Sequence, residues 1–300
     1  MPMTENNGAK VWQLRDRRAQ FTRLAMWLLG TLAFVQAWQQ IADQTEWYYV
    51  ATAPVAANDI LTRALPPKWG YISQLGQPIW DTLNMATLGT VFALIMAVPV
   101  AFLAARNTSP RIPIHSSILA LIPKPVRFFI MRQTGQDIWT VGIIRPIALL
   151  IIVSTRSVNS LIWALLLVSI VGPGVFAGVI AISIRSIGFC AKLLYEAIEE
   201  ISEVQVEAVT ATGASRWQVM AYGIMPQIMP ALAGIAVFRW DINIRESTVL
   251  GLVGAGGIGV QLNASMNVLS WSQVSLILLV ILGAVVIGEW VSAKVRGAII

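Results

Sequence analysis

Long stretches without charge dominate the pattern of hydrophobic and polar positions along this chain. Five windows contain no Asp, Glu, Lys or Arg and are long enough to cross a membrane: residues 24–42, 82–105, 157–184, 217–238 and 247–288. About 20 apolar residues span the hydrocarbon core of a bilayer, and a charge at its centre costs several kcal/mol. The last window is too long for one crossing and begins with a glycine-rich half, so its helix is expected at about residues 272–291.

The distribution of Lys and Arg predicts the side of the membrane on which each segment lies. Basic residues precede the first span, occur in residues 106–136 without any acid, and follow the last span. Loops rich in Lys and Arg stay in the cytoplasm, so both termini are predicted to be cytoplasmic and the number of crossings to be even. A sixth helix is therefore expected over residues 138–156. Its Arg145 and Arg156 must reach toward opposite interfaces or face the protein interior.

These spans predict an all-α fold, a polytopic transmembrane helical bundle of about six helices. Residues 1–79 are expected to form an N-terminal cytoplasmic tail, the first transmembrane helix and an outer loop, and residues 80–293 the main transmembrane domain. Within the first part, residues 43–79 carry more acid than base and contain four residues that favour turns, so an irregular loop is predicted there. These four are Pro54, Pro66, Pro67 and Gly70.

Composition supports a membrane protein and limits its chemistry. Hydrophobic residues make up 56% of the chain, charged residues 12%, and the mean hydropathy is +0.69. The net charge of +6 does not indicate nucleic-acid binding, because the basic residues form no single cluster with aromatics between them. The single Cys190 excludes an internal disulfide, and the single His115 leaves no histidine metal site. The sequence also lacks an ATP-binding G-x-x-x-x-G-K-[ST] loop and a recognisable nucleophile constellation, so no catalytic residue, metal or cofactor is expected in this chain.

Five glutamates recur with helical spacing after the fourth charge-free window. They are Glu196, Glu199, Glu200, Glu203 and Glu207, at i, i+3, i+4, i+7 and i+11. At this spacing all five carboxylates share one face of a single helix leaving the membrane. The stripe taken alone favours the solvated face of a cytoplasmic helix.

The next segment, EAVTATGASRWQVMAYGIMP over residues 207–226, changes this interpretation. It predicts a helix, a turn permitted by Gly213, and a second short helix that starts near Ser215. Such a two-helix knob is able to sit in a groove of another protein. Trp217, with Val219 and Met220, would supply the apolar anchor, and Glu207 and Arg216 the polar rim.

This segment resembles the cytoplasmic loop signature of ATP-binding-cassette importer permeases: Glu-Ala-Ala, three residues, Gly, nine residues, then Ile-x-Leu-Pro. Glu207, Ala208, Gly213 and Pro226 match at the right spacing, whereas Val209, Gly223 and Met225 depart from it. The resemblance implies that residues 196–226 form a coupling loop, which docks into a cleft of an ATPase subunit. ATP is then used by that partner.

Three further stretches are similar to the phosphonate importer branch of these permeases: residues 81–107, 156–182 and 239–259. The chain has Asn159 and Ser160 where a Pro-Glu pair is expected, and Glu246 where a small residue is common. The resemblance implies a type I importer (MetI-like) permease core in the inner membrane that moves phosphonate-type oxyanions by alternating access.

The resemblance also implies a set of partners. These are an ATPase dimer, a second permease copy, with a homodimer expected and a heterodimer left open, and a periplasmic phosphonate-type solute-binding protein. Phosphite or another small nutrient is the alternative substrate, and a non-transporting membrane interaction subunit is the distant alternative.

Two groups of residues near the fifth window are candidates for the substrate path or a gate. Gly254, Gly256 and Gly259 spell G-x-G-x-x-G, but no acid occurs between Glu246 and Glu289, so dinucleotide binding is rejected. These glycines are expected to form a tight segment at the outer mouth, either as a gate or for close packing.

The second group consists of Arg239, Asn243 and Arg245. Guanidinium donors match phosphonate oxygens in bidentate fashion, so the two arginines are suited to passing an anion. Internal ion pairs with Asp241 and Glu246 are the other interpretation of the same residues. The sequence leaves both open.

Overall fold

The computed structural model describes residues 3–6, 9–12, 17–108 and 144–299, so most of the predicted basic inner segment 106–136 lies outside the described residues. The chain divides into two compact units, Met1–Thr62 and Arg63–Ile300. The predicted domain division at residue 80 remains a prediction.

The first unit contains a short hairpin and helices. Strands β1 (Met3–Asn6) and β2 (Ala9–Trp12) pair antiparallel, which is a local exception to the all-α prediction. Helix α1 (Arg17–Gln44) contains the predicted first span, but it is not among the helices long and apolar enough to cross a membrane. The span was predicted from the absence of charged residues alone. Glutamine is uncharged but polar, and the glutamines in the second half of α1 lower the hydropathy of this helix.

The predicted irregular loop over residues 43–79 is wrong. Helix α2 (Trp47–Ala64) occupies its first half, with Pro54 inside the helix, and the 3₁₀ helix η1 (Trp69–Gln74) follows. Several alanines around Pro54 favour helix, and they outweigh the single break that the proline introduces.

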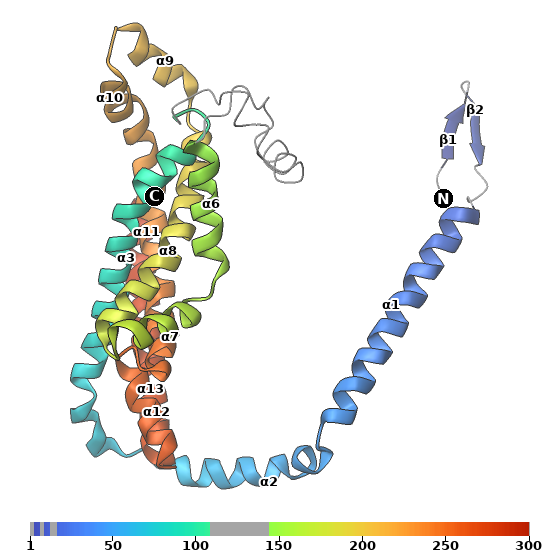
Figure 1. Ribbon diagram of the computed structural model, residues 1–300, viewed down its shortest axis with the longest axis vertical. Helices are drawn as coiled ribbons and strands as arrows, with labels where there is room; N and C mark the ends of the chain where they lie inside the picture. Colours follow the sequence, from blue (N-terminus) through green and yellow to red (C-terminus); the bar gives the residue numbers. More distant parts are fainter. Residues whose placement is uncertain (1–2, 7–8, 13–16, 109–143, 300) are drawn as a thin grey trace. The chain divides into compact units, whose positions relative to one another are not determined.

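The second unit is a helical bundle with α8 at its centre (Figure 1). Helix α8 packs against α3, α6, α7 and α11, and α13 packs against α11 and α12. The elements are α3 (Gly76–Ala104), α6 (Ile144–Ser157), α7 (Ser160–Val171), α8 (Val175–Glu199), α9 (Glu203–Ala211), α10 (Arg216–Gln218), the π-helical turn η2 (Val219–Ile224), α11 (Met225–Leu250), the 3₁₀ turn η3 (Gly251–Val253), α12 (Ile258–Asn267) and α13 (Trp271–Ile299).

Among the described residues, four helices are long and apolar enough to span a membrane, against the six expected from sequence. They are Gly76–Ala104, Val175–Glu199, Arg216–Val253 and Trp271–Ala298. Helices α6 and α7 pass the same test only as a pair, bent by 88°, which raises the number to five.

The predicted separate crossings at 138–156 and 157–184 are therefore wrong, because two breaks divide this region. Asn159 caps α7 by accepting a hydrogen bond from the backbone nitrogen of Leu161, and this stops α6 from continuing. Gly172 and Gly174, with φ of 98° and 149°, then separate α7 from α8. Neither break contains a charged residue, so windows defined by the absence of charge did not reveal these breaks.

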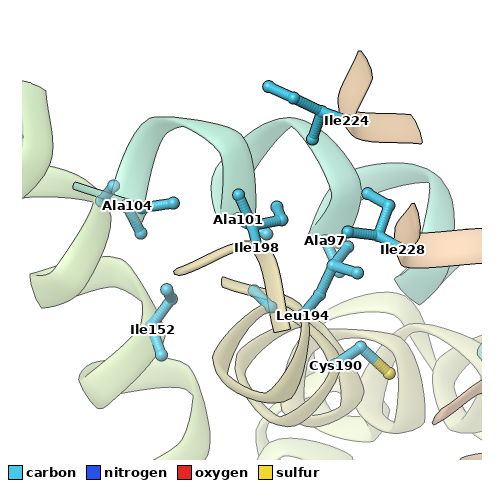
Figure 2. Close-up of a cluster of buried hydrophobic side chains, with 12 residues drawn as sticks. Ala97, Ala101, Ala104, Ile152, Cys190, Leu194, Ile198, Ile224 and Ile228 are labelled. Carbon is cyan, nitrogen blue, oxygen red and sulfur yellow. The ribbon is translucent and has the colours of Figure 1, made fainter. Parts of the chain in front are cut away.

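Small residues bring α3 against α8. Ala97, Ala101 and Ala104 of α3 are fully buried against Leu194 and Ile198 of α8 (Figure 2). Because lipid tails are as apolar as these side chains, close packing rather than exclusion of water holds such helices together in a membrane. The alanines permit that packing.

The same principle governs the contact between α6 and α8 at Gly188. A Cβ atom on Gly188 would lie 2.8 Å from both the backbone nitrogen of Arg156 and the carbonyl oxygen of Ile152. Backbone atoms cannot give way as side-chain ends can, so only glycine permits this approach. The contact also brings Arg156 beside Phe189, with 5.9 Å from its Cζ atom to the ring centroid.

We predict that Gly188→Ala separates α6 from α8 and lowers the free energy of unfolding by about 1–3 kcal/mol, the usual cost of overpacking. The measurement is unfolding of the purified permease in mixed micelles. Gly234→Ala is the matched control, because a Cβ atom there meets nothing within 4 Å in the described structure. Equal stability of the two variants would contradict the assigned contact.

Candidate functional site

A two-helix knob protrudes from one end of the bundle (Figure 1). Gly213 makes the turn after α9 with a φ of +79°, and Ser215 begins the next helix with a capping box closed by Gln218. The predicted turn and second helix are confirmed. The second helix is not a separate short one, however, because α10 continues through η2 into α11.

The knob presents all six coupling residues predicted from sequence at its surface. Trp217 is 79% exposed. Val219 and Met220, the other predicted anchors, are half-buried. The full set of exposed coupling residues is Glu207, Ala208, Gly213, Arg216, Trp217 and Pro226.

The knob is braced from within. Gly223 of η2 lies under α9, where a Cβ atom would be 3.6 Å from the Cα atom of Val206 and 3.8 Å from Val209. The side chain of Gln227 accepts a hydrogen bond from the Ser202 backbone nitrogen at 3.0 Å. The two helices of the knob therefore pack as one piece on the start of α11.

The five glutamates do not share one helix face, which corrects the predicted acidic stripe. Helix α8 ends at Glu199 and α9 begins at Glu203, so residues 200–202 break the periodicity. Glu196 pairs with Lys192, and Glu199 turns toward the bundle. Ser202 is the residue before α9, and a serine with β-region backbone is typical of a helix start.

Glu199 instead forms a clasp at the base of the knob. Its Oε1 atom lies 3.5 Å from Nη2 of Arg145 and accepts a hydrogen bond from the Arg106 backbone nitrogen at 2.9 Å. Arg145 also donates from Nε to the carbonyl oxygen of Ala104 at 2.9 Å. The Glu199 clasp therefore joins the ends of α3, α6 and α8. Arg145 faces the protein interior, one of the two positions expected for it.

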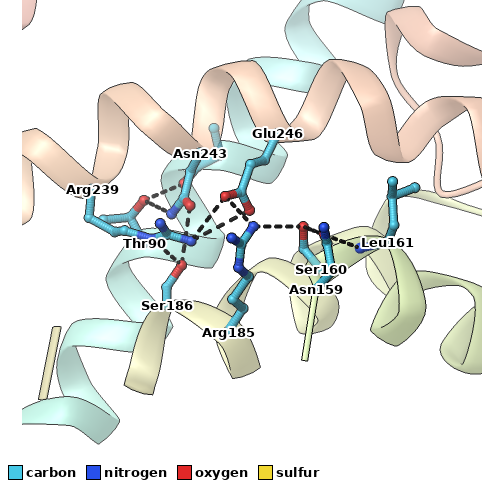
Figure 3. Close-up of polar contacts among 10 residues, drawn as sticks. Thr90, Asn159, Ser160, Leu161, Arg185, Ser186, Arg239, Asn243 and Glu246 are labelled. Atoms are coloured by element: carbon cyan, nitrogen blue, oxygen red, sulfur yellow. Dashed lines mark hydrogen bonds and ion pairs between the residues drawn. The ribbon is translucent and has the colours of Figure 1, made fainter. Parts of the chain in front are cut away.

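A network of polar side chains crosses the bundle between α3, α8 and α11 (Figure 3). Arg239, whose side chain is 4% exposed, donates from Nε to Ser186 Oγ at 2.9 Å and lies 3.4 Å from Glu246. Asn243, fully buried, donates to Thr90 Oγ1 at 2.8 Å and accepts from Ser186 at 3.2 Å. Side chains of α3, α8 and α11 are thus hydrogen-bonded to one another.

Arg185 of α8 completes the network. Its Nη1 atom lies 2.5 Å from Glu246 Oε1 and 3.3 Å from Ser160 Oγ, at the first turn of α7. Arg185 is not among the site residues predicted from the sequence. There, Arg185 only borders the charge-free window 157–184. Glu246 was the available signal, because an interior carboxylate needs a cationic partner. Arg239 and Arg245 in the same segment offered such a partner without Arg185.

Ion pairs account for both arginines proposed for the substrate path. Arg239 pairs with Glu246, and Arg245 pairs with Asp241 one turn earlier on α11. These pairs differ in environment, since the Arg245 side chain is 49% exposed. Arg245 lies outside the hydrogen-bonded network that contains Arg239 and Asn243.

The glycine-rich segment shows close packing. A Cβ atom on Gly251 would lie 2.6 Å from the Cα atom of Gly259, and one on Gly256 would lie 2.9 Å from the Val175 backbone nitrogen. Gly254 accepts a hydrogen bond from Gly174 at 3.0 Å, which ties this segment to the turn before α8. A helical turn, η3, precedes these glycines, so the strand that a dinucleotide motif needs is replaced by a helix.

A bundle of apolar helices with a paired polar interior and an exposed two-helix knob is the architecture of a polytopic membrane permease. The chain belongs to the family of binding-protein-dependent transport system inner membrane components, whose model matches residues 129–295. Its location is the inner membrane, which it crosses several times. Permeases of this family require a separate ATPase subunit and a binding protein, and they are not themselves enzymes.

Curated relatives cover most of the chain. The phosphite transport system permease protein PtxC of Stutzerimonas stutzeri is 37% identical over 234 residues, 78% of this chain and 74% of that protein. The phosphate-import permease protein PhnE of Mycolicibacterium smegmatis is 33% identical over 252 residues, 83% of this chain and 42% of that protein.

Solved structures agree on the fold. The chain superposes on an inward-facing structure of the MetNI methionine ABC transporter with a TM-score of 0.56 and 19% sequence identity. The match covers 77% of this chain and 98% of the other. The predicted MetI-like, type I importer permease fold is therefore confirmed.

We predict that Glu246→Gln destabilises the permease by about 3–5 kcal/mol, because it leaves two interior guanidinium groups without their carboxylate. Lys192→Ala is the control, since it removes a partly exposed i,i+4 pair with Glu196 and costs about 0–1 kcal/mol. Unfolding of both variants in mixed micelles provides the comparison. A larger loss in Lys192→Ala than in Glu246→Gln would show that the interior charge pairing is assigned to the wrong residues.

Proposed function

We propose that this importer permease moves a small tetrahedral oxyanion of phosphorus, a phosphonate or phosphite, into the cell. The observation that carries the proposal is the 37% identity to a phosphite permease over 78% of the chain. The likeness of residues 81–107, 156–182 and 239–259 to phosphonate importers supports the same class of substrate. Phosphate is the second candidate, because a relative 33% identical is named a phosphate importer.

Two copies of the permease would form the pathway, on an ATPase dimer and beneath a periplasmic phosphonate-type binding protein. A single chain has one knob, and an ATPase dimer offers two equivalent grooves. The knob end would face the cytoplasm, together with both termini, as the basic residues of the sequence favour. ATP would be used by the ATPase alone, with no cofactor bound by this chain.

The knob would carry the motion of the ATPase to the pathway. Trp217 would fill a groove of the ATPase, with Glu207 and Arg216 at its rim. Because α10, η2 and α11 form one continuous helical segment, displacement of the knob also moves the part of α11 that carries Arg239, Asn243 and Glu246. ATP binding would open the pathway outward, and hydrolysis would return it inward.

We predict that cells carrying this permease with its ATPase and binding protein accumulate labelled methylphosphonate or phosphite. Excess of the unlabelled transported anion should abolish uptake, whereas sulfate should not. Competition with phosphate tests the second candidate in the same assay. If an assembled complex hydrolyses ATP but takes up none of the three phosphorus anions, the substrate class is wrong.

For the knob, we predict that Trp217→Ala weakens binding of the ATPase about 30-fold or more, as loss of a buried aromatic anchor does. The measurement is the dissociation constant of the purified permease and ATPase. Trp80→Ala is the matched control, because Trp80 is also an exposed tryptophan, 60% exposed, but lies near the start of α3.

Two further variants test coupling rather than binding. Gly213→Val places a β-branched residue at a φ of +79°, and Glu207→Lys reverses the charge at the rim. Both should abolish transport and substrate-stimulated ATP hydrolysis while membrane insertion is retained. Normal coupling in both variants would refute the assignment of the knob.

A further inference from the structure

Three guanidinium groups surround one aromatic ring inside the bundle. The Cζ atoms of Arg239, Arg185 and Arg156 lie 4.9, 5.5 and 5.9 Å from the ring centroid of Phe189. Arg239 and Arg185 share a single carboxylate, that of Glu246. Arg156 forms no ion pair within the described parts of the chain.

The arginine cluster, defined as Arg156, Arg185 and Arg239, therefore carries more positive charge than the acids among the described residues neutralise. Ser160 and Ser186, the other polar partners of Arg185 and Arg239, are uncharged. The remaining acid nearby on α11, Asp241, pairs with Arg245. A phenyl ring attracts cations but does not cancel their charge.

Backbone packing enforces this concentration of charge. Gly188 holds α6 against α8, which fixes Arg156 beside Phe189, and Glu246 fixes Arg185 and Arg239. Arg185 has a second feature of an incomplete site, since its Nε atom is buried and makes no hydrogen bond. Uncompensated charge among membrane helices is expensive, and such residues in membrane proteins commonly mark an ion or substrate path.

We propose that Arg156 and Arg185, beside Glu246 and Phe189, form a transient binding site for the transported phosphorus oxyanion. The proposal rests on the proposed function and adds the residues that contact the anion within the permease. Both side chains are accessible in part, with 22% of the Arg185 side chain exposed and Arg156 half-buried, whereas Arg239 is buried and positions Glu246.

The chemistry of the cluster suits a tetrahedral oxyanion. A guanidinium group offers parallel N–H donors that match two oxygens of a phosphonate or phosphite. Glu246 competes with the anion for Arg185 and repels it, so binding is weak. Weak binding is what transport requires, because the anion must leave toward the cytoplasm as readily as it enters.

The test uses the whole complex of permease, ATPase and binding protein in liposomes of zwitterionic lipid. We expect Arg156→Gln and Arg185→Gln each to reduce the maximal rate of uptake about tenfold, the effect of losing a charge-assisted hydrogen bond. The half-saturating concentration of loaded binding protein should not change, because the binding protein makes the first contact with the anion. Arg156→Lys should recover part of the rate, since it keeps the charge without the paired donors.

Lys192→Gln is the matched control. It removes one positive charge from α8 at a partly exposed pair with Glu196, and Lys192 is not among the cations that contact the Phe189 ring in the described structure, so this variant should transport normally. Assembly of each variant is judged by co-purification with the ATPase. Arg156→Gln is the decisive variant, because no ion pair of the described structure is lost with it.

A direct binding measurement accompanies the transport assay. Millimolar methylphosphonate, phosphite or phosphate should raise the melting temperature of the permease–ATPase complex without the binding protein. Arg156→Gln should abolish this shift and Lys192→Gln should retain it. Liposomes containing phosphatidylglycerol form a separate arm, because a lipid headgroup presents the same phosphate oxygens.

The outcomes distinguish failure of the proposed function from failure of the proposed binding site. If the wild-type complex takes up none of the three anions, the proposed function fails and the binding site falls with it. If the wild type transports one of them and Arg156→Gln transports at the rate of Lys192→Gln, with the same melting shift, only the binding site is overturned. Stabilisation by phosphatidylglycerol alone, with no effect of the soluble anions, would identify a lipid site and also overturn it.

Discussion

Pairing of interior charge around Glu246 is the constraint on which the arrangement of the bundle depends. The carboxylate is 15% exposed and is shared by Arg239 of α11 and Arg185 of α8. Because an unpaired charge between membrane helices is costly, α8 and α11 have to face each other at this level. Asn243, Ser186 and Thr90 extend the same contact to α3 through neutral hydrogen bonds.

A second carboxylate applies the same solution at the C-terminal end of α8. Glu199 holds Arg145 and the start of the segment after α3, so the ends of three helices are tied together just before the knob. Between the two carboxylates, alanine and glycine bring backbones close enough for dispersion forces to act. The knob is therefore mounted on a rigid base, and its continuous connection to α11 leads back to the polar network.

Local signals in the sequence were sufficient to predict the turn of the knob and the two apolar helices α3 and α13. Gly213 and Ser215 predicted the turn and the helix start, because backbone conformation and capping depend on neighbours in sequence. The predicted span at 82–105 ends one residue beyond α3, and the predicted helix at 272–291 lies inside α13. Where charges lie inside a span, as in α8 and α11, a criterion based on their absence misplaced the ends.

The sequence by itself determined that this is a polytopic membrane permease with a helix–turn–helix knob, since hydropathy and the Glu207–Pro226 motif are properties of contiguous residues. Only the tertiary structure decided which charges are paired, that α6 and α7 bend instead of crossing separately, and that three arginines meet at Phe189. The physical reason is that the free energy of an interior charge depends on partners far away in sequence. Arg185 and Glu246 lie on different helices, and their contact exists only once α8 and α11 have packed.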